Sequence, residues 1–509
     1  MTVTKIYSAQ IHILEPVTIA VEVDITNGTL HAFSIVGLPD KAVEEARDRV
    51  SSAIKNSGYT SPKQQQQKVI ISLSPASLKK SGTAFDLACA IGYLVANESI
   101  SPKNTDAILF LGELALDGTL QPVAGILPLL IHAKESGFTQ AIIPKQNATE
   151  ALHADGITIF AVSSLSEAIR VINQDPGYTP LTPESHIHSE TKPTIDMADI
   201  KGQESAKRAL TIAVSGGHNI GLFGPPGTGK TMLAKASTGI LPPLTHHESI
   251  EATSIHSIAG TLKGDILLEP PFRAPHHTSS YVSVIGGGSY PKPGEITLAH
   301  HGILFLDEFP EFDRRVIESL REPLEEGVVR ISRSKGSALF PARFMCIIAL
   351  NPCPCGNFGI HGKRCVCTPL SLERYRRKLS GPIVDRIDIW CEVTTIPFEK
   401  LSNTRTGKPS RVIQTHVIEA RTIQQHRFRN YSYTKNSDIT ARDIQLIAPL
   451  SKSATTILNT AAIRLDISAR SYHKIIKIAR TIADLDKKEN IEDDHILEAL
   501  QYRPKFKEY

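Results

Sequence analysis

The chain has 509 residues, which is too long for a single hydrophobic core and predicts about three domains. Its net charge is only +4, so no global positive field indicates a nucleic-acid partner, and any such partner must be held by local patches. It has neither an apolar run of about 18 residues nor an apparent signal peptide. We therefore expect no membrane partner and a cytoplasmic location, where disulfides are rare.

The chain is predicted to have an α/β fold with four segments. Residues 1–172 alternate strand-like runs with amphipathic helical runs. Residues 173–198 include a stretch rich in Pro, Ser, Thr and His without periodicity, which is typical of an exposed linker. Residues 199–395 alternate buried strands with helices, the pattern of a parallel sheet with crossover helices. Residues 396–509 are predicted to be helical.

A phosphate-binding loop is the clearest motif. The run Gly224-Pro225-Pro226-Gly227-Thr228-Gly229-Lys230-Thr231 matches GxxxxGK[ST] without a substitution, between a predicted strand and a predicted helix. Its glycines let backbone N–H groups turn toward phosphate oxygens. Lys230 can then reach the β- and γ-phosphates, and the Thr231 hydroxyl can bind Mg²⁺. We expect ATP and Mg²⁺ as cofactors.

An acidic pair follows the predicted buried strand Gly302 to Leu306. Asp307 is expected to hold Mg²⁺, directly or through water, and Glu308 to act as the general base on the attacking water. The alternative is that these carboxylates form an N-terminal helix cap.

Another predicted strand, Phe344 to Leu350, ends in Asn351. The C-terminal ends of parallel strands face the ligand site, so Asn351 is expected to orient the attacking water or contact the γ-phosphate. A turn-forming asparagine before Pro352 is the alternative.

Four of the seven cysteines lie close together in the sequence: Cys353, Cys355, Cys365 and Cys367. Two thiolate pairs joined by a short loop can form a tetrahedral zinc site, although zinc usually prefers two to four residues between paired ligands. His361 lies in the loop as a substitute ligand. A reduced thiol cluster and an iron–sulfur centre remain as alternatives.

Several other polar segments are predicted from the residues alone. Residues 327–340 have the pattern of a β-hairpin with its turn near Gly336, for which an ordinary solvated hairpin is the default. The pairs His276-His277 and His300-His301 are expected to have a structural or substrate-loop role, since no acidic or thiol partner lies at ligand spacing. The basic segment Arg405 to Lys435 is either a DNA contact or an exposed face.

By its motifs the chain resembles the AAA+ ATPases, in particular their magnesium-chelatase-like branch and, within it, the ComM (YifB) family. The similarity runs from Val36 to near the C-terminus. The motifs that carry it are Ser279 to Phe312, Leu320-Arg321-Glu322-Pro323-Leu324-Glu325-Glu326-Gly327, Asn351-Pro352-Cys353-Pro354-Cys355-Gly356 and Ala479-Arg480-Thr481-Ile482-Ala483-Asp484-Leu485.

This resemblance implies a homohexameric ring with each ATP site at a subunit boundary. It makes Arg386 the arginine finger that reaches a neighbour's γ-phosphate, and Arg470 the sensor arginine of the helical lid. Without the resemblance, an ion pair would be the default for either arginine. It also places the hairpin in the central pore, where Arg330, Arg333 and Lys335 would bind DNA that is single-stranded, double-stranded or branched.

The implied function is an ATP-driven helicase or branch-migration motor, acting in homologous recombination of incoming DNA during natural transformation, with recombination proteins as candidate partners. Two alternatives remain. One is a magnesium-chelatase ATPase subunit, which the N-terminal domain argues against. The other is a protein-remodelling ATPase, which would want an aromatic pore loop, with Tyr281 the only candidate.

Residues 1–172 resemble the proteolytic domain of Lon, through Leu109 to Gly118 and Pro122 to Gly125. Lon-type hydrolysis needs a serine nucleophile and a lysine base. Ala84 and Leu127 stand at the positions that correspond to them, so we expect no peptidase activity. The expected role of this Lon-like domain is to bind DNA or to organise the ring.

Overall fold

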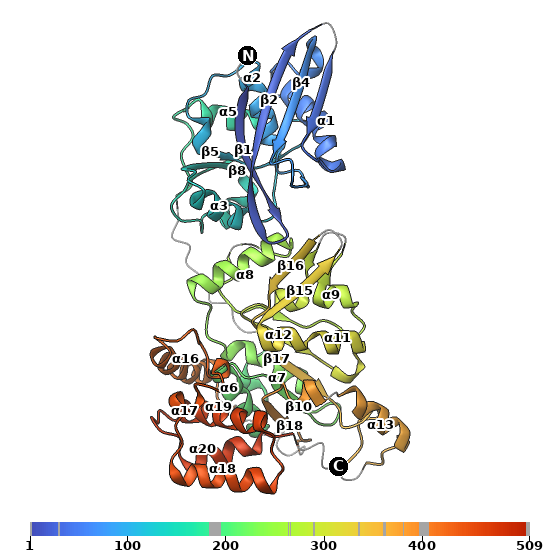
Figure 1. Ribbon diagram of the computed structural model, residues 1–509, viewed down its shortest axis with the longest axis vertical. Helices are drawn as coiled ribbons and strands as arrows, with labels where there is room; N and C mark the ends of the chain where they lie inside the picture. Colours follow the sequence, from blue (N-terminus) through green and yellow to red (C-terminus); the bar gives the residue numbers. More distant parts are fainter. Residues whose placement is uncertain are drawn as a thin grey trace. The chain divides into compact units, whose positions relative to one another are not determined.

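The computed structural model describes residues 3–28, 31–182, 195–262, 264, 266–288, 291–333, 336–359, 363–379, 381–396 and 407–504, with the backbone alone described at residues 333 and 336 (Figure 1). The chain divides into two compact units. The first comprises Met1–His188 and Ser249–Leu267, and the second comprises Ser189–Glu248 and Leu268–Tyr509. Within the described residues no helix is both long and apolar enough to cross a membrane.

The first unit contains a mixed seven-stranded sheet in the order β3-β4-β2-β1-β5-β8-β9. Its strands are β1 (Thr4–His12), β2 (Glu15–Asn27), β3 (Ala32–Val36), β4 (Gln67–Ser74), β5 (Ile108–Phe110), β8 (Gln140–Pro144) and β9 (Thr158–Val162), with the small pair β6 (Glu113–Leu114) and β7 (Leu120–Gln121) beside it. β1 pairs antiparallel with β2 along the whole length of β1, whereas β5, β8 and β9 continue the sheet in parallel. The alternating burial of β4 explains its strand pattern, because one side chain in two faces the core.

Helices cover this sheet and complete the apolar core of the first unit. They are α1 (Lys41–Asn56), α2 (Asp86–Ala96), α3 (Ile126–Glu135), α4 (Ala148–Ala151) and α5 (Leu165–Ile172). α2 is apolar and almost fully buried, whereas α1 keeps a polar face. Residues 249–267, which the sequence assigned to the ATPase segment, pack with this unit, so the sequence pattern did not locate that excursion of the chain.

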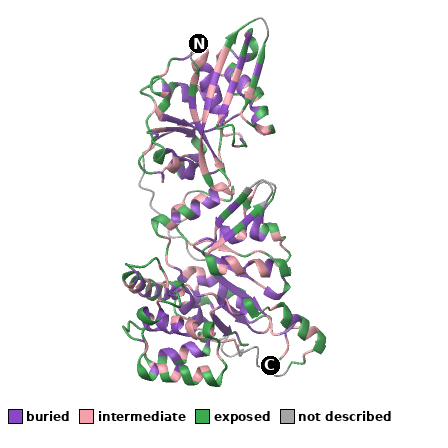
Figure 2. Cartoon of the chain, in the orientation of Figure 1, coloured by how far each residue is buried: buried purple, intermediate pink, exposed green. Residues whose placement is uncertain are grey.

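The second unit is built on a parallel five-stranded sheet in the order β11-β14-β17-β10-β18. The strands are β10 (Ile220–Phe223), β11 (Phe272–Arg273), β14 (Ile303–Leu306), β17 (Met345–Leu350) and β18 (Ile389–Glu392). β10, β14 and β17 are buried at every residue, which is why they are continuous apolar runs in the sequence (Figure 2). Strand β10 lies between β17 and β18 and runs parallel to both, so its C-terminal end faces the same edge as theirs.

The second unit contains further helices and short strands outside this sheet. In the ATPase segment they are α6 (Glu204–Gly216), α7 (Lys230–Ala236), α8 (His246–Ile258, continuing into the first unit), α9 (Tyr281–Ile285), β12 (Gly286–Gly287), β13 (Lys292–Pro293), α10 (Glu295–Leu298), α11 (Arg314–Ser319), α12 (Arg321–Glu326), β15 (Val328–Arg333), β16 (Gly336–Pro341), α13 (Pro369–Lys378) and α14 (Gly381–Val384). The C-terminal helices are α16 (Ser410–Arg427), α17 (Ile444–Ile447), α18 (Lys452–Arg464), α19 (Ala469–Leu485) and α20 (Asp493–Gln501). This mixed α/β architecture with a parallel core and a helical C-terminal region confirms the predicted fold class.

Candidate nucleotide site

The phosphate-binding loop leaves the C-terminal end of β10 and enters α7. At Gly224 a Cβ atom would collide with the Val393 carbonyl oxygen, so only glycine fits there. Gly227 and Gly229 have φ angles of +79° and +89°, in the region that glycine adopts without strain. These conformations curl the loop so that the free N–H groups at the start of α7 can face a bound phosphate.

Lys230 is folded back into this loop. Its Nζ donates to the carbonyl oxygens of Gly224 at 2.7 Å and Pro225 at 2.8 Å, and to Asn351 Oδ1 at 3.0 Å. Burial lowers the pKa of Lys230 to about 8, and the nearby Asp307 carboxylate opposes that shift. All three ammonium protons are engaged, and phosphate oxygens can replace these acceptors.

The two residues expected to hold Mg²⁺ are in contact. Thr231 Oγ1 donates to Asp307 Oδ2 at 2.7 Å, which joins the start of α7 to the end of β14. This arrangement fits Mg²⁺, which binds one or two protein oxygens together with waters and phosphate. Asp307 Oδ1 also accepts the backbone N–H of Glu308 at 2.9 Å.

Glu308 lies at the edge of the site with a φ of +49°, a conformation that non-glycine residues seldom adopt. Its Oε2 is 3.0 Å from His277 Nδ1. The sequence spacing indicated no acidic partner for the His276-His277 pair, but the fold brings His277 from the loop after β11 to the predicted general base. His277 is therefore a functional candidate that the sequence did not reveal.

Asn351 follows β17 directly and is held from two sides. Its side-chain oxygen accepts a hydrogen bond from Lys230 Nζ, and its backbone carbonyl accepts one from the Tyr375 hydroxyl at 3.0 Å. The phosphate-loop cluster, defined as Lys230, Thr231, Asp307, Glu308 and Asn351, is thus assembled by the ends of three neighbouring strands.

Arg386 and Arg470 lie together, but they are bound to Glu325 and not to the phosphate-binding loop. Arg386 Nη2 is 2.7 Å from Glu325 Oε2, and Arg470 Nη2 is 2.7 Å from Glu325 Oε1. Burial raises the pKa of Glu325, but hydrogen bonds from the two arginines outweigh it and leave that pKa below its ordinary value. One carboxylate of α12 therefore holds both the predicted arginine finger and the predicted sensor arginine.

The helix α19 positions the segment around Arg386. Its Lys474 donates to the backbone carbonyls of Asp385 and Ile387, the latter at 3.0 Å, and lies 3.4 Å from an Asp388 carboxylate oxygen. α19 thus carries Arg470, and through Lys474 it also binds the loop that contains Arg386.

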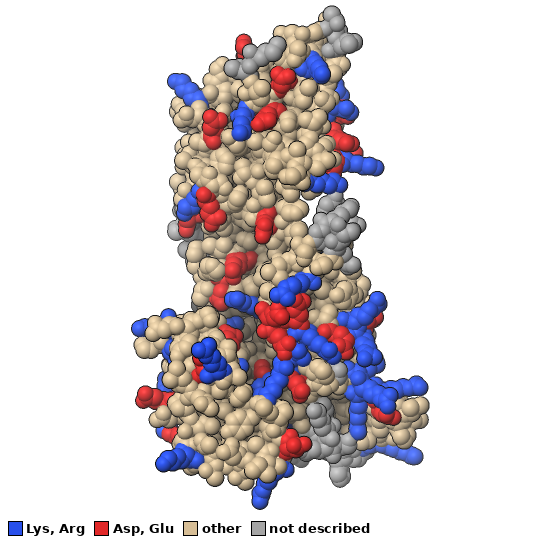
Figure 3. Space-filling model, viewed as in Figure 1, with Lys and Arg blue, Asp and Glu red and all other residues tan. Residues whose placement is uncertain are grey.

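The predicted hairpin is formed by β15 and β16. Arg330 Nη1 lies 3.1 Å from Glu322 and its Nη2 lies 2.8 Å from Glu326, so this arginine is ion-paired within its own subunit. Only the backbone of Arg333 is described, and Lys335 lies outside the described residues. Figure 3 shows lysine and arginine side chains gathered over the part of the second unit where α11 and α13 lie.

The basic segment near residue 421 is largely structural. Arg421 is half-buried and donates to the Val214 carbonyl at 2.7 Å, and desolvation of its guanidinium lowers its pKa to about 10. Arg427 binds the carboxylate of the buried Asp484. Both arginines are half-buried and hydrogen-bonded within the chain, whereas Arg429 of the same segment is exposed. No contact within the chain tests the DNA interpretation of this segment.

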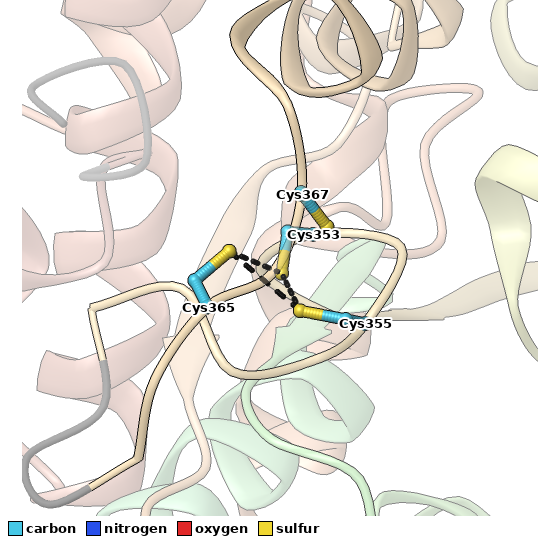
Figure 4. Close-up of side chains that lie close together, drawn as sticks. All are labelled: Cys353, Cys355, Cys365 and Cys367. Carbon is cyan, nitrogen blue, oxygen red and sulfur yellow. Dashed lines mark hydrogen bonds between the residues drawn. The ribbon is translucent and has the colours of Figure 1, made fainter.

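The four clustered cysteines converge in space, as Figure 4 shows. Their sulfur atoms all lie within 4.8 Å of one another. Cys353 is fully buried, and the other three are half-buried. Backbone N–H groups of Asn357 and Val366 lower the pKa of Cys355 to about 6. His361 lies outside the described residues.

In the first unit the positions of the missing dyad have structural roles. Leu127 is fully buried in the apolar core, and its N–H donates to Glu150 Oε1 at 2.9 Å. The Ala84 carbonyl accepts the N–H of Gly112 at 3.1 Å. Alanine and leucine side chains carry no group able to act as nucleophile or base.

Three family profiles match the chain. Residues 196–401 match "Magnesium chelatase, subunit ChlI", residues 21–147 match "Subunit ChlI of Mg-chelatase", and residues 407–503 match "Magnesium chelatase, subunit ChlI C-terminal". Competence protein ComM of Haemophilus influenzae is 41% identical over 99% of this chain and 98% of its own length. The chain belongs to the ComM and YifB family.

Other proteins are similar to the whole chain or to part of it. The YifB protein of Salmonella typhimurium is 40% identical over 95% of this chain and 94% of its own length. Lon protease 2 of Bacillus subtilis is 34% identical over 103 residues, which are 20% of this chain and 18% of its own. The ComM and YifB family is a group of magnesium-chelatase-like AAA+ ATPases, as the motifs predicted, and ATP with Mg²⁺ fits the phosphate-loop cluster.

Proposed function

We propose that the chain is one subunit of a homohexameric, ATP-driven DNA motor. It promotes branch migration or strand separation in homologous recombination when incoming DNA is integrated during natural transformation. The transformation setting rests on the likeness to Competence protein ComM, which spans 99% of the chain. The motor chemistry rests on the residues of the second unit.

One observation supports the proposal that the subunits assemble into a ring. The phosphate-loop cluster contains a lysine, Mg²⁺ ligands, a base and a polar sensor, but the hydrogen bonds of Arg386 and Arg470 are made elsewhere, with Glu325 and the Pro382 carbonyl. Charge that develops on the transferred phosphoryl group is commonly stabilised by an arginine. A second copy of the chain, presenting this arginine pair, would complete the site.

Each residue then has a defined task in ATP hydrolysis. Lys230 would bind β- and γ-phosphate oxygens in place of its present carbonyl partners. Thr231 and Asp307 would hold Mg²⁺, whose charge would neutralise that of the phosphates. Glu308 accepts a proton from the attacking water, with its carboxylate oriented by His277. Asn351 orients that water or contacts the γ-phosphate.

The proposed DNA contact is the β15–β16 hairpin. Six copies would line a central channel with Arg330, Arg333 and Lys335, which suits a phosphate backbone. Because Arg330 is bound to Glu322 and Glu326, contact with DNA requires phosphate to displace these carboxylates. Binding is therefore expected to weaken steeply with salt.

The magnesium-chelatase subunit remains the second candidate, because all three matching profiles carry that description. One of them covers residues 21–147, so the N-terminal domain does not argue against this function, contrary to the expectation from the sequence. We favour the DNA motor because the likeness to Competence protein ComM extends over nearly the whole of both chains.

The decisive assay is migration of a synthetic four-way or three-strand DNA junction with ATP. The wild type should move the junction, and DNA should raise its ATPase rate. The Glu308→Gln variant should bind ATP, assemble and stall, because it keeps every phosphate contact but loses the base. An immobile junction together with an ATPase rate indifferent to DNA would reject the motor.

A further inference from the structure

The loop that carries the four clustered cysteines, from residue 353 to residue 367, lies next to the nucleotide site in both sequence and space. We propose that Cys353, Cys355, Cys365 and Cys367 bind one Zn²⁺ as a closed structural site, and that this site positions Asn351 for ATP hydrolysis. The zinc site stands on the sulfur geometry alone. The positioning role rests on the proposed ATPase function.

The sulfur positions match a tetrahedral ion. A Zn–S bond of about 2.3 Å in a tetrahedron places neighbouring sulfurs about 3.8 Å apart. Here Cys353 Sγ lies 3.3 Å from Cys355 Sγ and 3.8 Å from Cys365 Sγ, and the latter two are 3.6 Å apart. These distances are far longer than the roughly 2.0 Å of a disulfide, and all four cysteines are free. Four thiolates leave no open position, which is characteristic of structural zinc.

The local backbone explains how single-residue spacing can work. Cys353 is fixed by the end of β17 and is fully buried. Gly356 then adopts a φ of +79°, and the chain turns so that the N–H of Phe358 donates to Cys353 Sγ at 3.3 Å. Backbone amides aimed at a thiolate stabilise its charge, which Zn²⁺ binding requires.

The loop is joined to the nucleotide site at both ends. At its start Cys353 is two residues beyond Asn351, whose side chain accepts from Lys230. At its end α13 follows Cys367, and Tyr375 of α13 donates to the Asn351 carbonyl. Closing the loop with an ion therefore fixes Asn351 from both directions.

The loop also supports the phosphate-binding loop itself. Gly356 packs so closely against Pro226 that a Cβ at position 356 would collide with the proline ring. Since Pro226 is the third residue of the phosphate-binding run, loss of the ion is expected to disturb the Lys230–Asn351 contact without removing any group that touches ATP directly.

Metal analysis of the full-length protein, purified without a chelator, tests the site. We expect about one zinc per chain, and loss of that zinc in the Cys365→Ser/Cys367→Ser variant. The matched control is Cys89→Ala, whose thiol is buried in the first unit, and which should keep its zinc. Well under half a zinc per chain in the wild type, or iron with sulfide in its place, would overturn the site.

Steady-state ATPase kinetics test the positioning role separately. The double serine variant should lose roughly 10-fold to 100-fold in kcat with little change in KM, because the geometry at Asn351 is disturbed. Asn351→Ala should cause a similar loss, and combining the two should add little, since both act through one group. Circular dichroism checks the fold. Unchanged kcat in a folded, zinc-free variant, or fully additive losses, would refute the positioning role.

If wild-type protein fails in the junction assay, only the motor proposal fails. The zinc content and the ATPase kinetics do not depend on that result.

Discussion

At the residue scale, Lys230 shows how burial prepares a side chain for a ligand. Its ammonium is engaged by two carbonyls and one amide oxygen, none of which carries a full negative charge. Burial therefore lowers its pKa to about 8. Phosphate oxygens would compensate the charge and raise that pKa, so nucleotide binding and protonation of Lys230 are coupled.

This coupling predicts that ATP affinity depends on pH. Below about pH 8 Lys230 is already charged, whereas above it binding must take up a proton, so affinity should fall by up to about tenfold per pH unit. Calorimetric titration of the Glu308→Gln variant, which binds without turnover, measures the effect. Equal affinity at about pH 7 and pH 9 would disprove the coupling.

His277 is the second residue whose role is open to test. Because it contacts Glu308 and no described group of the phosphate-binding loop, its loss should affect the base rather than nucleotide binding. We expect His277→Ala to lower kcat about tenfold with KM unchanged. The neighbouring His276 bonds to Thr278, so His276→Ala is the matched control and should retain kcat. Equal kcat in the two variants would show that His277 does not assist Glu308 in catalysis.

At the element scale, α19 connects the C-terminal helical region to the arginine pair Arg386 and Arg470. It presents Arg470 to Glu325 and holds the Arg386 loop through Lys474. Its C-terminal half contains a buried network in which the fully buried Arg480 donates to Asp484 at 3.1 Å and to the carbonyls of Lys488 and Glu489. The family motif that contains Arg480 and Asp484 thus has a structural explanation.

Removing one partner of this network should be costly. Asp484 is fully buried, and Arg427, Arg480 and Asn436 all bond to it. Asp484→Asn removes the negative charge that faces the buried Arg480 and the half-buried Arg427, and we expect a loss of about 3–5 kcal/mol in unfolding free energy. Asp486→Asn, at a half-exposed ion pair, should cost less than about 1 kcal/mol. Chemical denaturation of both variants would reveal equal losses if the network contributes little.

Part of the site could be predicted because its chemistry lies in contiguous motifs. The phosphate-binding run and the Asp307-Glu308 pair each follow a buried strand, and the parallel sheet brings Asn351 to the same edge. The contacts of His277, Glu325 and Arg421 depend on how distant segments pack, which periodicity does not encode. The same limit explains why the sequence pattern did not show that residues 249–267 pack with the first unit.

At the scale of the whole molecule, we propose that the ATP site is divided between two copies of the chain. The phosphate-loop cluster belongs to one copy, and the arginine pair on Glu325 would serve the neighbouring one. The proposed division rests on the contacts of both sets of residues, and in a closed ring every subunit would give and receive the same surface.

Mixing two inactive variants tests this division most directly. Lys230→Ala and Arg386→Ala should each abolish ATP hydrolysis. A 1:1 mixture of the two variants, co-expressed or unfolded and refolded together, should recover up to about one quarter of wild-type ATPase activity. Half of the subunits keep Lys230, and half of their neighbours keep Arg386. A mixture of Lys230→Ala with the Lys230→Ala/Arg386→Ala double variant should stay inactive. No recovery in the first mixture, or full activity of Arg386→Ala alone, would contradict the shared site.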